Sequence, residues 1–114
     1  MTVHVGHDSS IEEGLGGYEV KSAEVYRAVA EKSATVVETL HDLRNVARRF
    51  FGEVPIRLCV QPDPDIPGYA PIYAEIRTPR TMQDSSERLQ RFDEATLEKL
   101  MKEPAEIYFM IVPQ

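Results

Sequence analysis

A helical stripe between residues 22 and 51 constrains the fold more than any other feature of this sequence. Apolar side chains recur there every three or four positions, with one polar gap at Ser33. This period predicts an α-helix with one apolar face. Ser22 can cap its start, and Gly52 stands where a helix favours a residue with positive φ at its end. The stripe consists of Tyr26, Val29, Val36, Leu40, Leu43, Ala47 and Phe50.

The predicted helix is long for its chain. About 30 residues in one α-helix span about 45 Å, which exceeds what a compact domain of 114 residues is expected to cover. Either the helix breaks, or its overhang packs on a partner. The stripe also fits the a and d positions of a heptad repeat. In a homodimer, the helices of the two chains would then pack against each other through Tyr26, Val29, Val36, Leu40 and Leu43. The alternative is that this face of the helix packs on the sheet of its own chain.

The period changes from helical to alternating after Gly52. Residues 56–61 and 72–77 alternate between apolar and polar side chains, which predicts two half-buried strands. The proline-rich loop 62–68 joins them, so the simplest arrangement is an antiparallel hairpin with a long connection. Pro71 has no N–H to donate, so the second strand is expected either at an edge of the sheet or beginning after Pro71.

A second helix and a third strand follow. Asp84 and Glu87 match a capped helix start, and Pro104 ends the helix. Its expected apolar face consists of Leu89, Phe92, Leu97, Leu100 and Met101. The continuous apolar run 107–112 predicts a strand that is covered on both faces or central in the sheet.

These elements predict one α+β domain over residues 21–114, in the order α-β-β-α-β. A small, mainly antiparallel, three-stranded sheet would be covered by the long N-terminal helix and the second helix. Residues 1–20 contain a glycine cluster at 14–17 and are expected to form a flexible arm.

The charge balance argues against nucleic acid as a partner. The net charge is −6, so the overall field repels phosphate backbones. A single cysteine and the lack of a long apolar run predict a cytoplasmic protein without a membrane span. All nine arginines lie between Arg27 and Arg91, which leaves a local anion site open.

The candidate ligand site lies between the 62–68 loop and the second helix. Arg77, Arg80 and Arg88 would supply cationic groups for an anion or phosphate, and Asp63, Asp65 and Glu75 would supply carboxylates. A solvated surface of mixed charge and turn-forming aspartates are the simpler interpretation of the same residues.

Other chemistry has weaker support in the sequence. Cys59 lies on a strand without a nearby histidine, and His4 and His7 would need a third ligand to hold a metal. We therefore predict no catalytic residues, metal or cofactor. Tyr69, Tyr73 and Tyr108 could share one face of the sheet, where aromatic side chains can bind partner proteins or bases.

The sequence does not identify a process. We expect a non-catalytic protein-interaction or regulatory module, such as an antitoxin-like or adaptor domain. It would be a homodimer joined through the long helix, a sheet edge or both, or it would bind another protein. The alternative is a small-molecule (anion or phosphate) binding domain or a small enzyme that uses the site described above.

Overall fold

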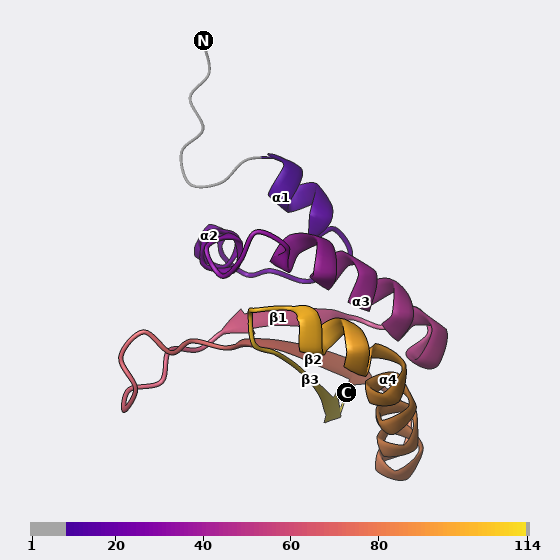
Figure 1. Ribbon diagram of the computed structural model, residues 1–114. Helices are drawn as coiled ribbons and strands as arrows, with labels where there is room; N and C mark the ends of the chain where they lie inside the picture. Colours follow the sequence, from indigo (N-terminus) through magenta and orange to yellow (C-terminus); the bar gives the residue numbers. More distant parts are fainter. Residues whose placement is uncertain (1–8, 114) are drawn as a thin grey trace.

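The computed structural model describes residues 9–113 and has the α+β architecture expected from the sequence (Figure 1). The elements follow the order α1 (Ser9–Gly14), α2 (Ala23–Ala30), α3 (Val36–Phe51), β1 (Ile56–Val60), β2 (Ile72–Thr78), α4 (Met82–Lys102) and β3 (Ile107–Pro113). Alternate residues of β2 are buried, so the helices cover one face of the sheet and leave the other without a helical layer.

The three strands form a mixed sheet in the order β1-β2-β3. β1 and β2 form the predicted antiparallel hairpin, with Leu58 opposite Ala74. β2 and β3 are parallel, with Ala74 opposite Phe109, because α4 carries the chain back to the end where β2 begins. The sheet is therefore not mainly antiparallel.

The position of β2 agrees with one of the two alternatives expected from the sequence, whereas the position of β3 corrects its expectation. β2 is central and begins directly after Pro71, so the missing N–H of that proline falls outside the ladder. β3 is an edge strand, although its residues form a continuous apolar run. Its two faces differ, since Ile107 is buried and Tyr108 is exposed.

The predicted helix 22–51 is broken between Ala30 and Val36, so its two parts, α2 and α3, fold separately. The chain turns at Ser33 and Thr35, whose hydroxyl groups donate to the Glu103 carboxylate at 2.6 Å and 2.8 Å. A long rod that needs a partner therefore does not form.

The break also changes the role of the apolar stripe. Val29, Val36, Leu40 and Leu43 are each 0% exposed within one chain, whereas Tyr26 and Phe50 keep part of their surface. These four side chains are thus unavailable to a second chain in this fold. The reason for expecting a helix seam between two copies is removed.

Part of the predicted flexible arm is packed against the core. Leu15 is 1% exposed and Tyr18 is 7% exposed. The Tyr18 hydroxyl donates to the carbonyl oxygen of Leu40 at 2.5 Å. Leu15 and Tyr18 therefore belong to the hydrophobic core, whereas His4 and His7 lie outside the described residues.

Thr81, not Asp84, caps α4, and its side chain accepts a hydrogen bond from the Asp84 N–H.

The apolar face of α4 is narrower than the sequence predicts. Phe92 is 0% exposed and packs on Phe109 of β3, with ring centroids 4.8 Å apart. Leu97 and Met101, by contrast, are 59% and 76% exposed. These two residues were expected in the core and lie outside it.

Candidate functional site

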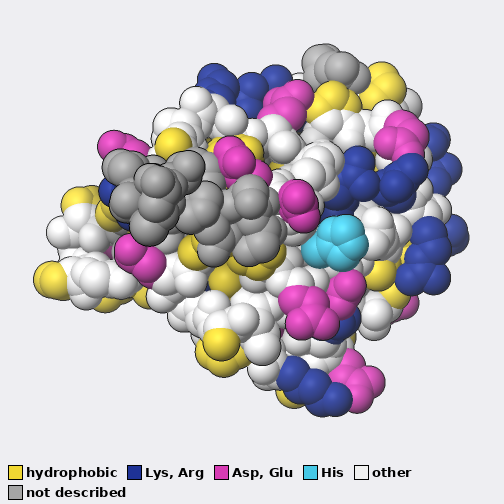
Figure 2. All heavy atoms as spheres, turned by 90° about the horizontal axis from the view of Figure 1, so that it is seen from above, with side chains coloured by type: hydrophobic (Ala, Val, Ile, Leu, Met, Phe, Trp, Pro, Cys, Tyr) yellow, Lys and Arg dark blue, Asp and Glu magenta, His cyan; other side chains and the backbone are white. Residues whose placement is uncertain are grey.

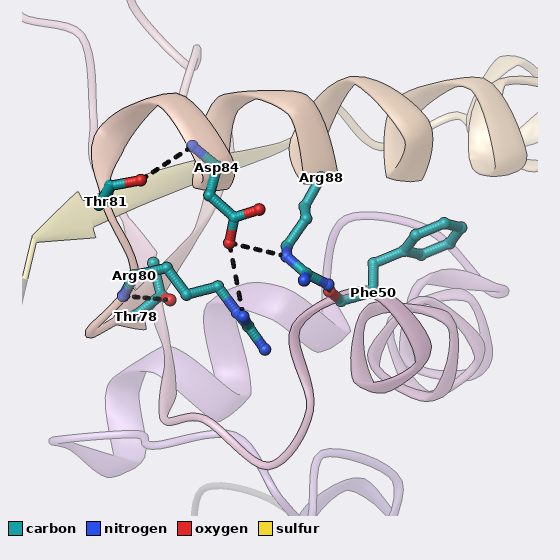
Figure 3. Close-up of polar contacts among 6 residues, drawn as sticks. All are labelled: Phe50, Thr78, Arg80, Thr81, Asp84 and Arg88. Atoms are coloured by element: carbon teal, nitrogen blue, oxygen red, sulfur yellow. Dashed lines mark hydrogen bonds and ion pairs between the residues drawn. The ribbon is translucent and has the colours of Figure 1, made fainter.

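The predicted arginine cluster forms in part at the beginning of α4 (Figure 3). Asp84 Oδ2 accepts from Arg88 Nε at 3.0 Å and lies 3.4 Å from Arg80 Nη1. The hydrogen bond from Arg88, followed by the charges of both arginines, lowers the pKa of the Asp84 carboxyl. The two cations are therefore already neutralised in part by a carboxylate of the same helix.

Arg88 has a second partner on another helix. Its Nη1 donates to the carbonyl oxygen of Phe50 at 2.7 Å (Figure 3). This carbonyl belongs to the last turn of α3, where backbone oxygens lack partners within the helix. Arg88 thus joins the start of α4 to the end of α3, which gives it a structural role.

The other four predicted ligand residues are not brought to this cluster. Arg77 and Glu75 project from the helix-free face of β2, because the residues between and beside them are buried on the helical face. The loop with Asp63 and Asp65 lies at the end of the sheet where β2 begins, whereas Arg80 follows the end of β2 (Figure 1). Asp63 Oδ1 accepts from the N–H of Asp65 at 2.8 Å, as in a loop-stabilising turn.

An open groove of about 470 Å³ separates α3 from α4. Its walls include acidic side chains from both helices and Lys99, which donates to Asp42 at 2.9 Å. At one end lies Glu103, which accepts hydrogen bonds from Ser33, Thr35, Thr39 and the N–H of Ala105. Burial opposes ionisation of Glu103, but these hydrogen bonds outweigh it and lower its pKa. This carboxylate holds the α2–α3 turn against the end of α4.

The helix-free face of the sheet carries Tyr73 and Tyr108, two of the three tyrosines that the sequence singled out, and the third, Tyr69, belongs to the loop before β2. Tyr73 and Tyr108 stack with ring centroids 5.7 Å apart. The hydroxyls of Tyr69 and Tyr108 both donate to Glu106 Oε2. Cys59 lies opposite Tyr73 on the same face, and partial burial, followed by the nearby Glu75 charge, raises the pKa of its thiol. No described helix covers this face.

The two edges of the sheet differ. The β1 edge is covered by the segment before α2, where the Glu19 N–H donates to Ile56 O at 2.7 Å and Glu19 O accepts from the Leu58 N–H at 3.0 Å. β3 pairs with β2 on one side, and no described segment pairs with it on the other. Its seven residues carry no charge. An uncharged, unpaired edge strand is a ready template for another strand.

Exposed large apolar side chains occur mainly on α4 and β3. Over residues 9–113, six large hydrophobic residues are exposed: Ile66, Met82, Leu97, Met101, Tyr108 and Met110. All except Ile66 belong to α4 or β3. The opposite side of the molecule, over α1 and α3, has a surface of mixed charge with basic side chains gathered toward the end of α3 (Figure 2).

Sequence reasoning missed this surface because it assigned Leu97 and Met101 to the core. The positions of Leu97 and Met101 relative to Lys99 already indicated that they lie outside the core. Leu97 and Met101 stand two positions before and after Lys99, so they lie on the side of α4 opposite to it. Lys99 pairs with Asp42 of α3. Leu97 and Met101 therefore point away from α3.

Neither metal ligands nor relatives point to another kind of site. Within residues 9–113, no group of three or more His, Cys, Asp or Glu side chains could hold a metal ion. None of the helices described is long and apolar enough to cross a membrane. Comparison of the chain with protein-family models, curated proteins and solved structures gives no match.

Proposed function

We propose that this protein is a non-catalytic interaction or regulatory module that acts by binding another polypeptide chain, with a homodimer as its basic state. The open, uncharged edge of β3 carries this proposal, because the other edge of the same sheet is covered by Glu19. An adaptor or antitoxin-like role fits such a module.

The distribution of polar groups supports binding over catalysis. Asp84 and Arg88 hold each other, and Glu103 is held by three hydroxyl groups and a backbone N–H. These groups stabilise contacts between helices. Five large apolar side chains of α4 and β3 are exposed as well, and exposed apolar surface of this kind is typical of protein–protein contacts.

The anion-binding alternative depends on Arg80. Its guanidinium is half-exposed and has one long contact, with Asp84 at 3.4 Å, so it could turn toward a phosphate. Arg88 is the only other predicted cation beside it, and the Phe50 carbonyl already occupies one of its donors. The site would consist of two arginines that share one carboxylate.

Light scattering coupled to size-exclusion chromatography tests the proposal. We expect the wild type to have twice the mass of the chain at high micromolar concentration. A Leu97→Lys/Met101→Lys variant should shift toward the monomer. Ile66→Lys is the matched control, because Ile66 is 51% exposed in the loop away from β3.

A wild type that stays monomeric throughout this concentration range would contradict the proposal, as would a dimer that both variants leave unchanged. Circular dichroism of each variant checks that the fold is intact. All three substituted side chains are more than half exposed, so folding should tolerate them.

A further inference from the structure

We infer that two copies of this chain join β3 to β3 in antiparallel orientation, with Phe109 opposite Phe109, and form one continuous six-stranded sheet. This inference rests on the proposed function and names its partner, its surface and its register. It draws on the backbone geometry of β3 and on the pattern of side chains along α4.

The ladder between β2 and β3 determines which backbone groups of β3 remain free. Ile72 is opposite Ile107, and its N–H donates to the carbonyl oxygen of Glu106 at 2.9 Å. In a parallel ladder the bonded residues alternate along each strand. Tyr108, Met110 and Val112 therefore bond to β2. Ile107, Phe109 and Ile111 direct their N–H and C=O groups to the open edge.

The free backbone groups of β3 match those of β3 in a second copy of the chain. In antiparallel pairing, residues that direct both groups outward face each other in hydrogen-bonded pairs. With Phe109 opposite Phe109, Ile107 faces Ile111, and each outward group from residue 107 to residue 111 gains a partner. Pro113, which has no N–H, falls beyond the paired segment. A one-residue shift of either strand would break the match.

The absence of charged side chains on β3 also permits two copies of the strand to pair. No Lys, Arg, Asp or Glu lies between Ile107 and Pro113, so two copies can approach without repulsion along the paired segment. Glu106, just before the strand, already accepts from Tyr69 and Tyr108. The edge thus lacks the charges by which natural edge strands avoid association.

Strand pairing alone buries little side-chain surface, and a stable interface buries about 1,200–2,000 Å² in total. α4 supplies the additional contact. Phe92 packs on Phe109, so the middle of α4 lies over the middle of β3. A two-fold axis at Phe109 then brings the two α4 helices side by side and antiparallel, on the flank opposite to α3.

The α4 side chains on this flank are self-complementary. Leu89 and Leu97 lie four residues before and after Asp93, with Met82 farther out. In an antiparallel helix pair centred on Asp93, Leu97 of each copy meets Leu89 of the other, and Met82 extends the contact at both ends. Leu97, which is exposed in one chain, becomes covered.

Cross-linking tests the register in a Cys59→Ser background. Tyr108 would lie opposite Met110 of the other copy, with Cβ atoms about 4.5–5.5 Å apart. A mixture of Tyr108→Cys and Met110→Cys proteins should form a disulfide-linked pair under mild oxidation, faster than either variant alone. Arg57→Cys, on the covered β1 edge, is the control that should remain unlinked.

A second variant tests the helix contact. Asp93 would approach its own copy across the axis, so Asp93→Asn should tighten the dimer by about three-fold, the scale of one solvent-screened pair of like charges. Glu94→Gln is the matched control, because Glu94 is exposed on the next position of α4 and off this flank. Sedimentation equilibrium gives both dissociation constants.

The outcomes separate this inference from the proposed function. Linkage in the mixture together with tighter association of Asp93→Asn supports the inference. A dimer that forms without either effect overturns the inference and leaves the proposed function standing. Cross-linking of Met110→Cys alone, without linkage in the mixture, also overturns it. A chain that is monomeric in light scattering overturns both.

Discussion

The rings of Phe92 and Phe109 meet with centroids 4.8 Å apart and a tilt of 50° between their planes, and this contact joins α4 to the edge strand of the sheet. Phe92 also meets Phe50 of α3 edge to face, with centroids 6.5 Å apart. One buried side chain thus links the two longest helices and β3.

Replacement of Phe92 by a small residue should therefore lower the free energy of unfolding strongly. Phe92→Ala is expected to lower the free energy of unfolding by about 3–5 kcal/mol, because the side chain is 0% exposed and its removal leaves a cavity. Phe92→Leu keeps most of the volume and should lose clearly less. Urea denaturation measures both, and a loss below about 1 kcal/mol for the alanine variant would contradict this packing.

Glu103 should stabilise the fold in a pH-dependent way. Its hydrogen bonds outweigh burial and lower its pKa in the folded chain, so the stabilisation is present above the unfolded value of about 4.3. It is lost as the pH falls through the lower folded value. Glu103→Gln should therefore be less stable than the wild type at pH 7 and converge with it in acid. Denaturation from pH 7 to 3 measures the difference.

Glu103→Ala gives a complementary measurement. It leaves three hydroxyl groups and the Ala105 N–H without their acceptor, so we expect a loss of about 2–3 kcal/mol at pH 7. Glu98→Ala, on the exposed surface of α4 shortly before Glu103, should change stability by less than about 0.5 kcal/mol. Equal effects of the two variants would show that Glu103 has no special role.

Arg88 and Arg80 should respond differently to substitution. Arg88→Met removes the hydrogen bond to the Phe50 carbonyl and should lower the unfolding free energy by about 1 kcal/mol. Arg80→Met removes only a half-exposed contact and should be close to neutral. A thermal-shift titration of the wild type with inorganic phosphate addresses the alternative function. A saturable rise in Tm that Arg80→Met abolishes would favour the anion site.

Hydrogen exchange can examine the two edges of the sheet independently. In a dilute monomer, the amides of Phe109 and Ile111 should exchange quickly, while those of Tyr108 and Met110 are protected by β2. The Leu58 amide, bonded to Glu19 O at 3.0 Å, should also be protected. A rise in protein concentration should slow exchange at Phe109 and Ile111 alone. Uniform protection along β3 at every concentration would contradict an open edge.

The strands and α4 were predictable because their signals are local. Alternation identified β1 and β2, and the proline-rich loop between them indicated a hairpin. Pro104 correctly indicated the end of α4, but the predicted cap, Asp84, lies three residues after the observed cap, Thr81. The parallel pairing of β3 was missed, since strand direction depends on where a crossover helix packs and no residue of β3 encodes it.

The break between α2 and α3 was not predictable from the stripe. The spacing of Val29 and Val36 continues the helical period across the turn, so the apolar pattern alone predicts one continuous helix. Ser33 and Thr35 leave the helix to bond with Glu103, which lies 70 and 68 residues away in the sequence. The candidate ligand residues are not all brought together, because alternation along β2 places Arg77 on the helix-free face of the sheet, whereas Arg80 lies beside Asp84 at the start of α4.

The Glu19 segment on the β1 edge has a consequence for how large an assembly can become. A sheet with two receptive edges can add copies without limit and grow into a fibre, whereas this sheet has one edge already occupied from within its own chain. Addition at β3 then uses up the only receptive edge of each copy within residues 9–113. Under the proposed pairing, growth would stop at a closed pair of two chains, which would leave no uncharged edge strand of the described residues open to further copies.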